Sequence, residues 1–200
     1  MPLSDSSEVD LIRRAKAGGD PKHCAAYAEA FDKHRKGIYS FLCRMLEGDL
    51  EEAKDQLQDV FVAGWKNLAQ LNNETCFRSW LFTIAANKAH GHLRQKQRVR
   101  MLDIDNDGAG DYFQAMQDVG FEEGVVKKVL TEQALARVPF NYRACLVLKE
   151  WGYSIKEIAE ILGLSEKSIP GMLLRGREMF CNAYRSLEEN ARLDLEGRPD

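Results

Sequence analysis

The chain has 200 residues, of which 44% are hydrophobic and 30% charged, a composition typical of one ordinary globular domain or two small helical ones. No apolar run approaches the roughly 20 residues that a membrane-spanning helix needs, and the first ten residues lack a signal-peptide pattern. We therefore expect a cytoplasmic protein. The five cysteines form no CxxC pair and leave an odd one over, which favours a reducing compartment over a disulfide framework. We expect thiols buried in the core at Cys24, Cys43, Cys76, Cys145 and Cys181.

The formal net charge of −3 is spread unevenly, and its distribution bears on partners more than its total does. Residues 75 to 102 contain no acidic side chain and six cationic ones, which are Arg78, Lys88, Arg94, Lys96, Arg98 and Arg100. Residues 103 to 123 contain seven acidic side chains and no lysine or arginine. A basic segment able to bind nucleic acid therefore precedes an acidic connector.

Helical spacing dominates residues 21 to 100 and predicts three or four helices after a short N-terminal segment, residues 1 to 20. The apolar positions that carry this spacing are Tyr27, Phe31, Ile38, Phe41, Leu42, Leu57, Val60, Phe61, Trp65, Phe77, Leu81, Ile84, Ala85 and Leu93. Breaks are expected at Gly48-Asp49 and at the polar stretch NNET, residues 72 to 75. No segment alternates with the period of a strand, so the fold class is all-α.

The glycines and aspartates of residues 101 to 124 predict a flexible acidic linker. Apolar residues recur at three- and four-residue steps again from 125 to 188, which predicts a second small helical domain, followed by a tail, residues 189 to 200. The expected architecture is two helical domains joined by this linker.

The second domain contains a predicted helix-turn-helix in YSIKEIAEILGLSEKS. Ser154 and Glu157 have the spacing of a capping box. Ala159 supplies a small residue for close packing, and Gly163 ends the first helix. Ser165 is a natural cap for the second helix, the one that normally enters the DNA major groove.

The stretch LSEKSIPGMLLRGR, residues 164 to 177, places a proline inside that reading helix. If Ser165 caps the helix, Pro170 forfeits a hydrogen bond and costs about 3 kcal/mol. If Ser168 is the cap, Pro170 falls in the first turn and costs little. The sequence therefore predicts a reading helix that begins late or bends.

Residues 53 to 98 resemble region 2 of bacterial sigma factors of the extracytoplasmic-function (ECF) group in the sigma-70 family, and residues 130 to 187 resemble region 4. The matching positions in region 2 are Asp55, Gln58, Asp59, Val60, Phe61, Trp65, Phe77, Arg78, Trp80, Leu81, Ile84, Ala85 and Asn87, followed by the basic end. The resemblance implies a promoter-specificity subunit without enzymatic activity or cofactor. It would bind the clamp helices and the flap of core RNA polymerase as well as promoter DNA, and an anti-sigma factor would hold it when idle.

The resemblance implies that Asp55, Gln58 and Asp59 bind core polymerase; their i, i+3, i+4 spacing puts them on one helix face. Phe61 and Trp65 are expected in the core. The expected minus-10 DNA contacts are Asn72, Asn73, Thr75, Arg78, Trp80, Asn87, Lys88, Arg94, Lys96 and Arg98, with Arg100 as a further phosphate contact. Phe82 is an alternative to Trp80 for base stacking, and one of the two is expected to be core.

The expected minus-35 contacts are Ser165, Lys167, Ser168, Gly171, Met172, Arg175 and Arg177. Pro170 and Met172 stand where region 4 usually carries lysine or arginine, so sequence-specific reading by this helix is expected to be weakened. The chain could read an unusual element, depend mainly on region 2, or rely on a partner.

Other chemistries are poorly supported. The stretch DIDNDGAGDYFQ, residues 103 to 114, resembles a calcium loop, but Gln114 cannot supply the bidentate carboxylate. The pairs His23-Cys24 and His90-His92 form no complete metal-ligand spacing, and no catalytic motif is present. Two alternatives remain: a sigma-like decoy that sequesters an anti-sigma factor without directing transcription, and a dimeric helix-turn-helix repressor.

Overall fold

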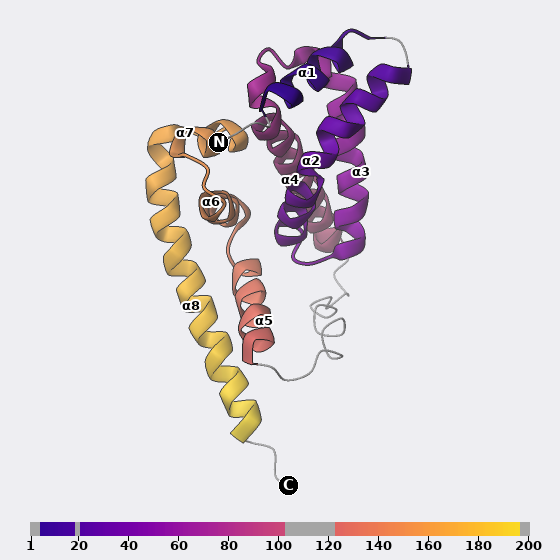
Figure 1. The fold of residues 1–200 in the computed structure, drawn as a ribbon. Coiled ribbons are helices and arrows are strands. Elements are labelled where there is room, and N and C mark those ends of the chain that lie inside the picture. Colours follow the sequence, from indigo (N-terminus) through magenta and orange to yellow (C-terminus); the bar gives the residue numbers. More distant parts are fainter. Residues whose placement is uncertain (1–4, 19–20, 103–122, 197–200) are drawn as a thin grey trace.

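The computed structural model describes residues 5–18, 21–102 and 123–196, and all regular elements within these ranges are helices (Figure 1). The α-helices are α1 (Asp5–Lys16), α2 (Pro21–Met45), α3 (Leu50–Asn67), α4 (Phe77–Leu102), α5 (Glu123–Ala136), α6 (Phe140–Glu150), α7 (Ile155–Leu162) and α8 (Ile169–Glu196). The described residues also contain the short 3₁₀ turns η1 (Leu68–Gln70), η2 (Glu74–Cys76) and η4 (Glu166–Ser168). The all-α prediction is confirmed, whereas the calcium-like stretch at 103 to 114 lies outside the described residues.

Helices α1 to α4 form an N-terminal bundle in which α2 packs against the other three. Its core contains Tyr27, Phe41 and Phe77, each with no exposed surface. The Tyr27 hydroxyl donates a hydrogen bond of 2.9 Å to the carbonyl oxygen of Phe61. A Cβ atom at position 64 would lie 2.2 Å from that hydroxyl, so Gly64 is what allows α3 to approach α2 at this point.

The boundaries within this bundle follow from local chemistry. Gly48 has a φ of 80°, which suits glycine, and Asp49 caps α3 by accepting a 3.1 Å hydrogen bond from the backbone N–H of Glu52. Asn73 starts η2 by accepting from the backbone N–H of Thr75 at 3.1 Å. Helix α4 then continues without a break through the basic segment to Leu102, which places the cationic residues on one rigid element.

Helices α5 to α8 form a C-terminal bundle that contains the predicted helix-turn-helix in α7 and α8. The Ser154 Oγ accepts from the backbone N–H of Glu157, while the Glu157 carboxylate accepts from the backbone N–H of Ser154, which completes the capping box. Gly163 ends α7 with a φ of 62°. Ile158 and Ala159 are buried on the face of α7 that the periodicity predicts.

The position of Pro170 follows from where α8 begins. Ser165 stands before the 3₁₀ turn η4, and α8 begins only at Ile169, directly after Ser168. Pro170 is thus the second residue of α8, where no intrahelical N–H bond is lost. The expectation of a late start is confirmed, and no helix-breaking cost arises.

The two bundles pack against each other (Figure 1), with contacts between α4 and α7 and between α2 and both α5 and α6. Arg143 of α6 is 2% exposed. It donates hydrogen bonds of 3.1 Å to the carbonyl oxygen of Arg44 and 3.2 Å to the carboxylate of Glu47. The ring of Phe82, from α4, lies 5.9 Å from that of Trp151 between centroids. Aromatic packing and a buried arginine therefore join the bundles.

The cysteine prediction holds only in part. Cys145 is buried and Cys43 is half-buried, but Cys24, Cys76 and Cys181 are exposed. The prediction of core thiols is wrong for these three, because their positions on α2, η2 and α8 face solvent. All five cysteines are free thiols.

Candidate nucleic-acid interface

Helix α3 presents Asp55, Gln58 and Asp59 on its exposed side, as their spacing predicts. Val62 extends this face by one turn, and 45% of its surface is exposed. The sequence reasoning missed Val62; its spacing of four from Gln58 and seven from Asp55 was the available signal. The exposed side of α3 is therefore a polar and acidic surface that ends in an apolar residue, Val62.

Phe61 and Trp65 point to the opposite side. Their rings lie 5.1 Å and 5.4 Å from the Tyr27 ring between centroids, and both pack against the buried core. The expectation that these two aromatic residues belong to the core is confirmed.

Two ion pairs and one contact between a histidine and a carboxylate connect α4 to α3 and its cap. Lys88 lies 2.7 Å from Asp59, His92 lies 2.9 Å from Glu52, and Lys96 lies 3.7 Å from Asp49. The three α4 residues are spaced four apart and share one face. That face of the basic helix is thus turned toward α3. Asp59 is expected to bind core polymerase and Lys88 to bind minus-10 DNA, but in this structure the two side chains pair with each other.

The other cationic side of α4 is open. Asn87, Arg94 and Arg98 are exposed at spacings of seven and four, so they share a second face. Neither Arg94 nor Arg98 makes an ion pair within the described ranges. Gly91 lies on the same face, and a Cβ there would meet nothing within 4 Å. The surface is therefore cationic, unobstructed and suited to a polyanion.

The loop before α4 supplies polar groups next to the start of that helix. Asn72, Asn73 and Thr75 are exposed, and the Asn73 side-chain oxygen accepts hydrogen bonds from Thr75, at 3.1 Å from its N–H and 2.8 Å from its hydroxyl. This oxygen is occupied within the loop. Of the two candidate stacking residues, Phe82 is 2% exposed and is core, while Trp80 is half-buried and stacks on Phe77 at 6.0 Å.

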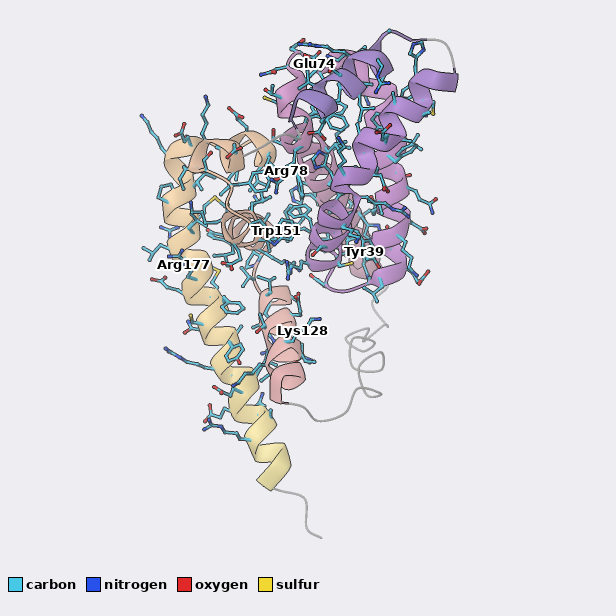
Figure 2. The ribbon with its side chains drawn as sticks, viewed as in Figure 1. Tyr39, Glu74, Arg78, Lys128, Trp151 and Arg177 are labelled. Atoms are coloured by element: carbon cyan, nitrogen blue, oxygen red, sulfur yellow. The ribbon has the colours of Figure 1, made fainter. Side chains whose placement is uncertain are left out.

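Arg78 lies between the two bundles (Figure 2), with its guanidinium 4.6 Å from the centroid of the Tyr153 ring. Burial raises the pKa of Tyr153 to about 12, so the ring is neutral at physiological pH and its face attracts the cation. Around this contact is a small hollow of about 150 Å³, lined by Thr75, Arg78, Ser79, Trp151, Gly152, Tyr153 and Glu157. The structure thus brings two expected minus-10 residues, Thr75 and Arg78, against the C-terminal bundle.

The start of α8 carries the expected minus-35 residues. Ser165, Lys167, Ser168, Gly171, Arg175 and Arg177 are all exposed. Met172 is only half-buried and packs against the core, so it is turned partly inward. Leu174 is 61% exposed, although the sequence reasoning did not count it as a contact. Arg177 lies on α8 away from the N-terminal bundle (Figure 2).

Metal ligation has no support in the part of the chain that the structure describes, where no three His, Cys, Asp or Glu side chains are placed to hold an ion. His90 stacks on Phe140 at 4.7 Å, and His92 pairs with Glu52. Among the helices described, none combines the length and apolar character needed to cross a bilayer.

A helix-turn-helix in one bundle and an open cationic helix in the other define a two-part DNA-binding protein. Residues 30–99 match the family Sigma-70 region 2, and residues 128–180 match Sigma-70, region 4. The chain is 31% identical over 184 residues to the ECF RNA polymerase sigma factor SigW of Bacillus subtilis (strain 168), which covers 88% of this chain and 96% of SigW. It therefore belongs to the ECF group of sigma factors in the sigma-70 family, whose members act in transcription initiation.

A further relative and two solved structures are also similar to this chain. The RNA polymerase sigma-H factor of Pseudomonas aeruginosa is 25% identical over 94% of this chain and 100% of that protein. Two solved structures have the same fold. CnrH in complex with the cytosolic domain of CnrY has a TM-score of 0.63 and 23% identity, covering 90% of this chain and 98% of that one. The sigma factor RpoE from Bartonella quintana, in complex with the anti-sigma factor NepR, has a TM-score of 0.64 and 18% identity, covering 80% and 96%.

Proposed function

We propose that this chain binds core RNA polymerase through the exposed face of α3 and promoter DNA through α4 and the start of α8, and that it thereby directs promoter-specific transcription initiation. The observation that carries the proposal is the division of the N-terminal bundle into an acidic face and a separate open cationic face. Arginines of a polymerase helix can pair with Asp55 and Asp59, while Arg94 and Arg98 remain available for phosphates.

The promoter-opening role falls to the loop at 72 to 75 and the first turns of α4. Unstacked bases are recognised by amides, hydroxyls and aromatic faces. Asn72 supplies an amide, Thr75 a hydroxyl and Trp80 an aromatic face, all within nine residues along the chain. Asn87 adds a second amide on the same helix as Trp80. Lys167, Arg175 and Arg177 would hold the phosphates of the minus-35 element.

Several further properties belong to this proposal. The chain acts in the cytoplasm, where polymerase and promoters are found, and has no enzymatic activity of its own. The clamp helices of the largest subunit would receive α3, and the flap would receive the C-terminal bundle. An anti-sigma factor is the expected inhibitor, a relationship supported by the RpoE–NepR complex. The decoy alternative is not favoured, because the relatives that match nearly the whole chain are sigma factors.

The proposal is tested by run-off transcription with purified core polymerase on a pool of promoter fragments. The wild-type chain is compared with an Asn87→Ala, Lys88→Ala variant and with Lys36→Ala, a matched control on the exposed side of α2. We expect specific transcripts from the wild type and the control and their loss in the double variant. If the wild-type chain binds core polymerase but opens no promoter, the chain is a decoy that sequesters an anti-sigma factor. If the wild-type chain does not bind core polymerase, the proposal is refuted.

A further inference from the structure

The first turns of α8 expose an apolar surface where a reading helix normally presents polar side chains. Ile169 and Leu173 point into the core, with exposures of 0% and 7%. The outward positions are Pro170, Gly171 and Leu174, and Leu174 is 61% exposed, more than any other large hydrophobic side chain described. A Cβ at Gly171 would meet nothing within 4 Å, so the backbone itself is accessible here.

A single exposed leucine needs no explanation, but the surroundings of this one point to a polyanion. Lys167 lies just before α8, and Arg175 and Arg177 lie after Leu174. All three cations are exposed, and none makes an ion pair among the residues with a described position. Between residues 164 and 178 the acidic side chains are Glu166 and Glu178, so cations outnumber acids along this stretch of the chain.

The major groove offers few features that an apolar surface can recognise. Guanine is read by bidentate arginine or lysine and adenine by asparagine or glutamine, and none of these stands at positions 170, 171 and 174. The apolar group that a base pair presents in the major groove is the C5 methyl of thymine. Glycine at 171 also removes the side chain that would keep the helix backbone away from the base edges.

We propose that α8 recognises its DNA element through thymine methyl groups, with Leu174 and Pro170 as the contacting side chains and Lys167, Arg175 and Arg177 holding the flanking phosphates. The inference rests on the proposed sigma function and specifies how its C-terminal bundle reads sequence. The late start of α8 contributes to this recognition. It places Pro170 in the first turn, where no intrahelical hydrogen bond is lost, and leaves the proline ring exposed on the face proposed to contact DNA.

The test uses holoenzyme assembled from the full chain and core polymerase. The upstream element is first located by scrambling successive blocks of an active promoter, and each thymine within it is then replaced by deoxyuridine, which removes only the methyl group. We expect each methyl that Leu174 contacts to contribute about 4-fold to the rate of open-complex formation, the effect of one buried methyl. Leu174→Ala should abolish the difference between thymine and deoxyuridine templates, and Leu174→Met should retain it.

Arg175→Ala is the matched control, since removal of a phosphate-binding cation should slow both templates equally. Leu174 is exposed, so Leu174→Ala should keep the thermal unfolding midpoint of the wild type. If its midpoint is lowered, Leu174→Gln is used in its place.

Equal activity on thymine and deoxyuridine templates, with transcription intact, would overturn the proposed recognition of methyl groups and leave the sigma function standing. Transcription insensitive to the upstream scrambling would likewise overturn it and assign the apolar surface to a protein partner. No transcription from any promoter would overturn the proposed function itself.

Discussion

The guanidinium of Arg78 and the ring of Tyr153 lie 4.6 Å apart, although the two residues belong to different bundles. Arg78 is expected to contact minus-10 DNA, and in this arrangement its cation faces an aromatic ring instead. Arg78 is exposed, so DNA that binds its guanidinium would compete with the Tyr153 ring for this cation. A cation–π contact contributes about 0.5–2 kcal/mol, depending on how far it is desolvated, so this contact alone does not hold the bundles together.

Arg143 is the side chain whose loss should separate the bundles most directly. Arg143→Met keeps the volume but removes the hydrogen bonds to Arg44 and Glu47, each worth about 1.5–3 kcal/mol for a charged donor. We expect an increased radius of gyration in small-angle X-ray scattering of the free chain. Arg177→Met, at an exposed position of α8, is the control. An unchanged radius for Arg143→Met would mean that the aromatic contacts suffice.

Gly64→Ala should destabilise the N-terminal bundle, because the new Cβ would lie 2.2 Å from the Tyr27 hydroxyl. Overpacking of this kind costs about 1–3 kcal/mol in the free energy of unfolding, measurable by urea denaturation. Adding Tyr27→Phe should restore part of the loss by removing the clashing oxygen. Gly91→Ala, where open space surrounds the new methyl, should instead stabilise α4 by about 0.5–1 kcal/mol. Equal effects of the two alanines would contradict this packing.

The Glu157 capping box makes stability depend on pH. Hydrogen bonds from the Ser154 side chain and backbone N–H hold the pKa of Glu157 below its usual range. A lowered pKa means that the contribution is complete above the pKa of the unfolded chain and is lost as pH falls through the folded pKa, from about pH 5 downward. Glu157→Ala should thus lose less stability than the wild type between pH 6 and pH 3, as measured by urea denaturation, whereas the neighbouring variant Glu160→Ala should follow the wild type.

Charge reversal on α3 should weaken assembly with polymerase. Asp55 is exposed and makes no ion pair within the described residues, so Asp55→Arg should leave the fold intact while opposing arginines on the partner. We expect affinity for core polymerase to fall at least about 10-fold, as measured by fluorescence anisotropy competition. Glu29→Arg makes the same charge change on α2 and should bind normally. A matching loss in both variants would show a general charge effect.

The two faces of α4 should differ in their salt response. Removing one phosphate-binding cation lowers the slope of log affinity against log salt by about 0.7–0.9, so Arg94→Ala and Arg98→Ala should each reduce the slope for promoter binding by holoenzyme. Lys96 lies 3.7 Å from Asp49 and is already partly neutralised, so Lys96→Ala should change the slope less. A larger effect at Lys96 would place the DNA on the face toward α3.

The sequence by itself determined the features that depend on neighbours along the chain. A helical period of 3.6 residues identified the buried faces containing Tyr27, Phe77 and Ile158. The capping box of Ser154 and Glu157, the glycine at 163 and the late start of the reading helix before Pro170 all follow from backbone hydrogen bonding within a few residues. These signals are local, so they could be recognised before any packing was known.

Only the tertiary structure decided which faces meet. The pairing of Lys88 with Asp59 joins residues 29 positions apart, and the hydrogen bond from Arg143 to the Arg44 carbonyl spans 99. Such contacts depend on how helices cross and on how two bundles dock, which helical periodicity does not encode. Leu174 was likewise overlooked, because the sequence places a leucine on a helix but does not say whether another element covers it. Exposure is a property of the assembled fold, and here it separates the face of α8 that we propose to contact DNA from the face that packs into the core.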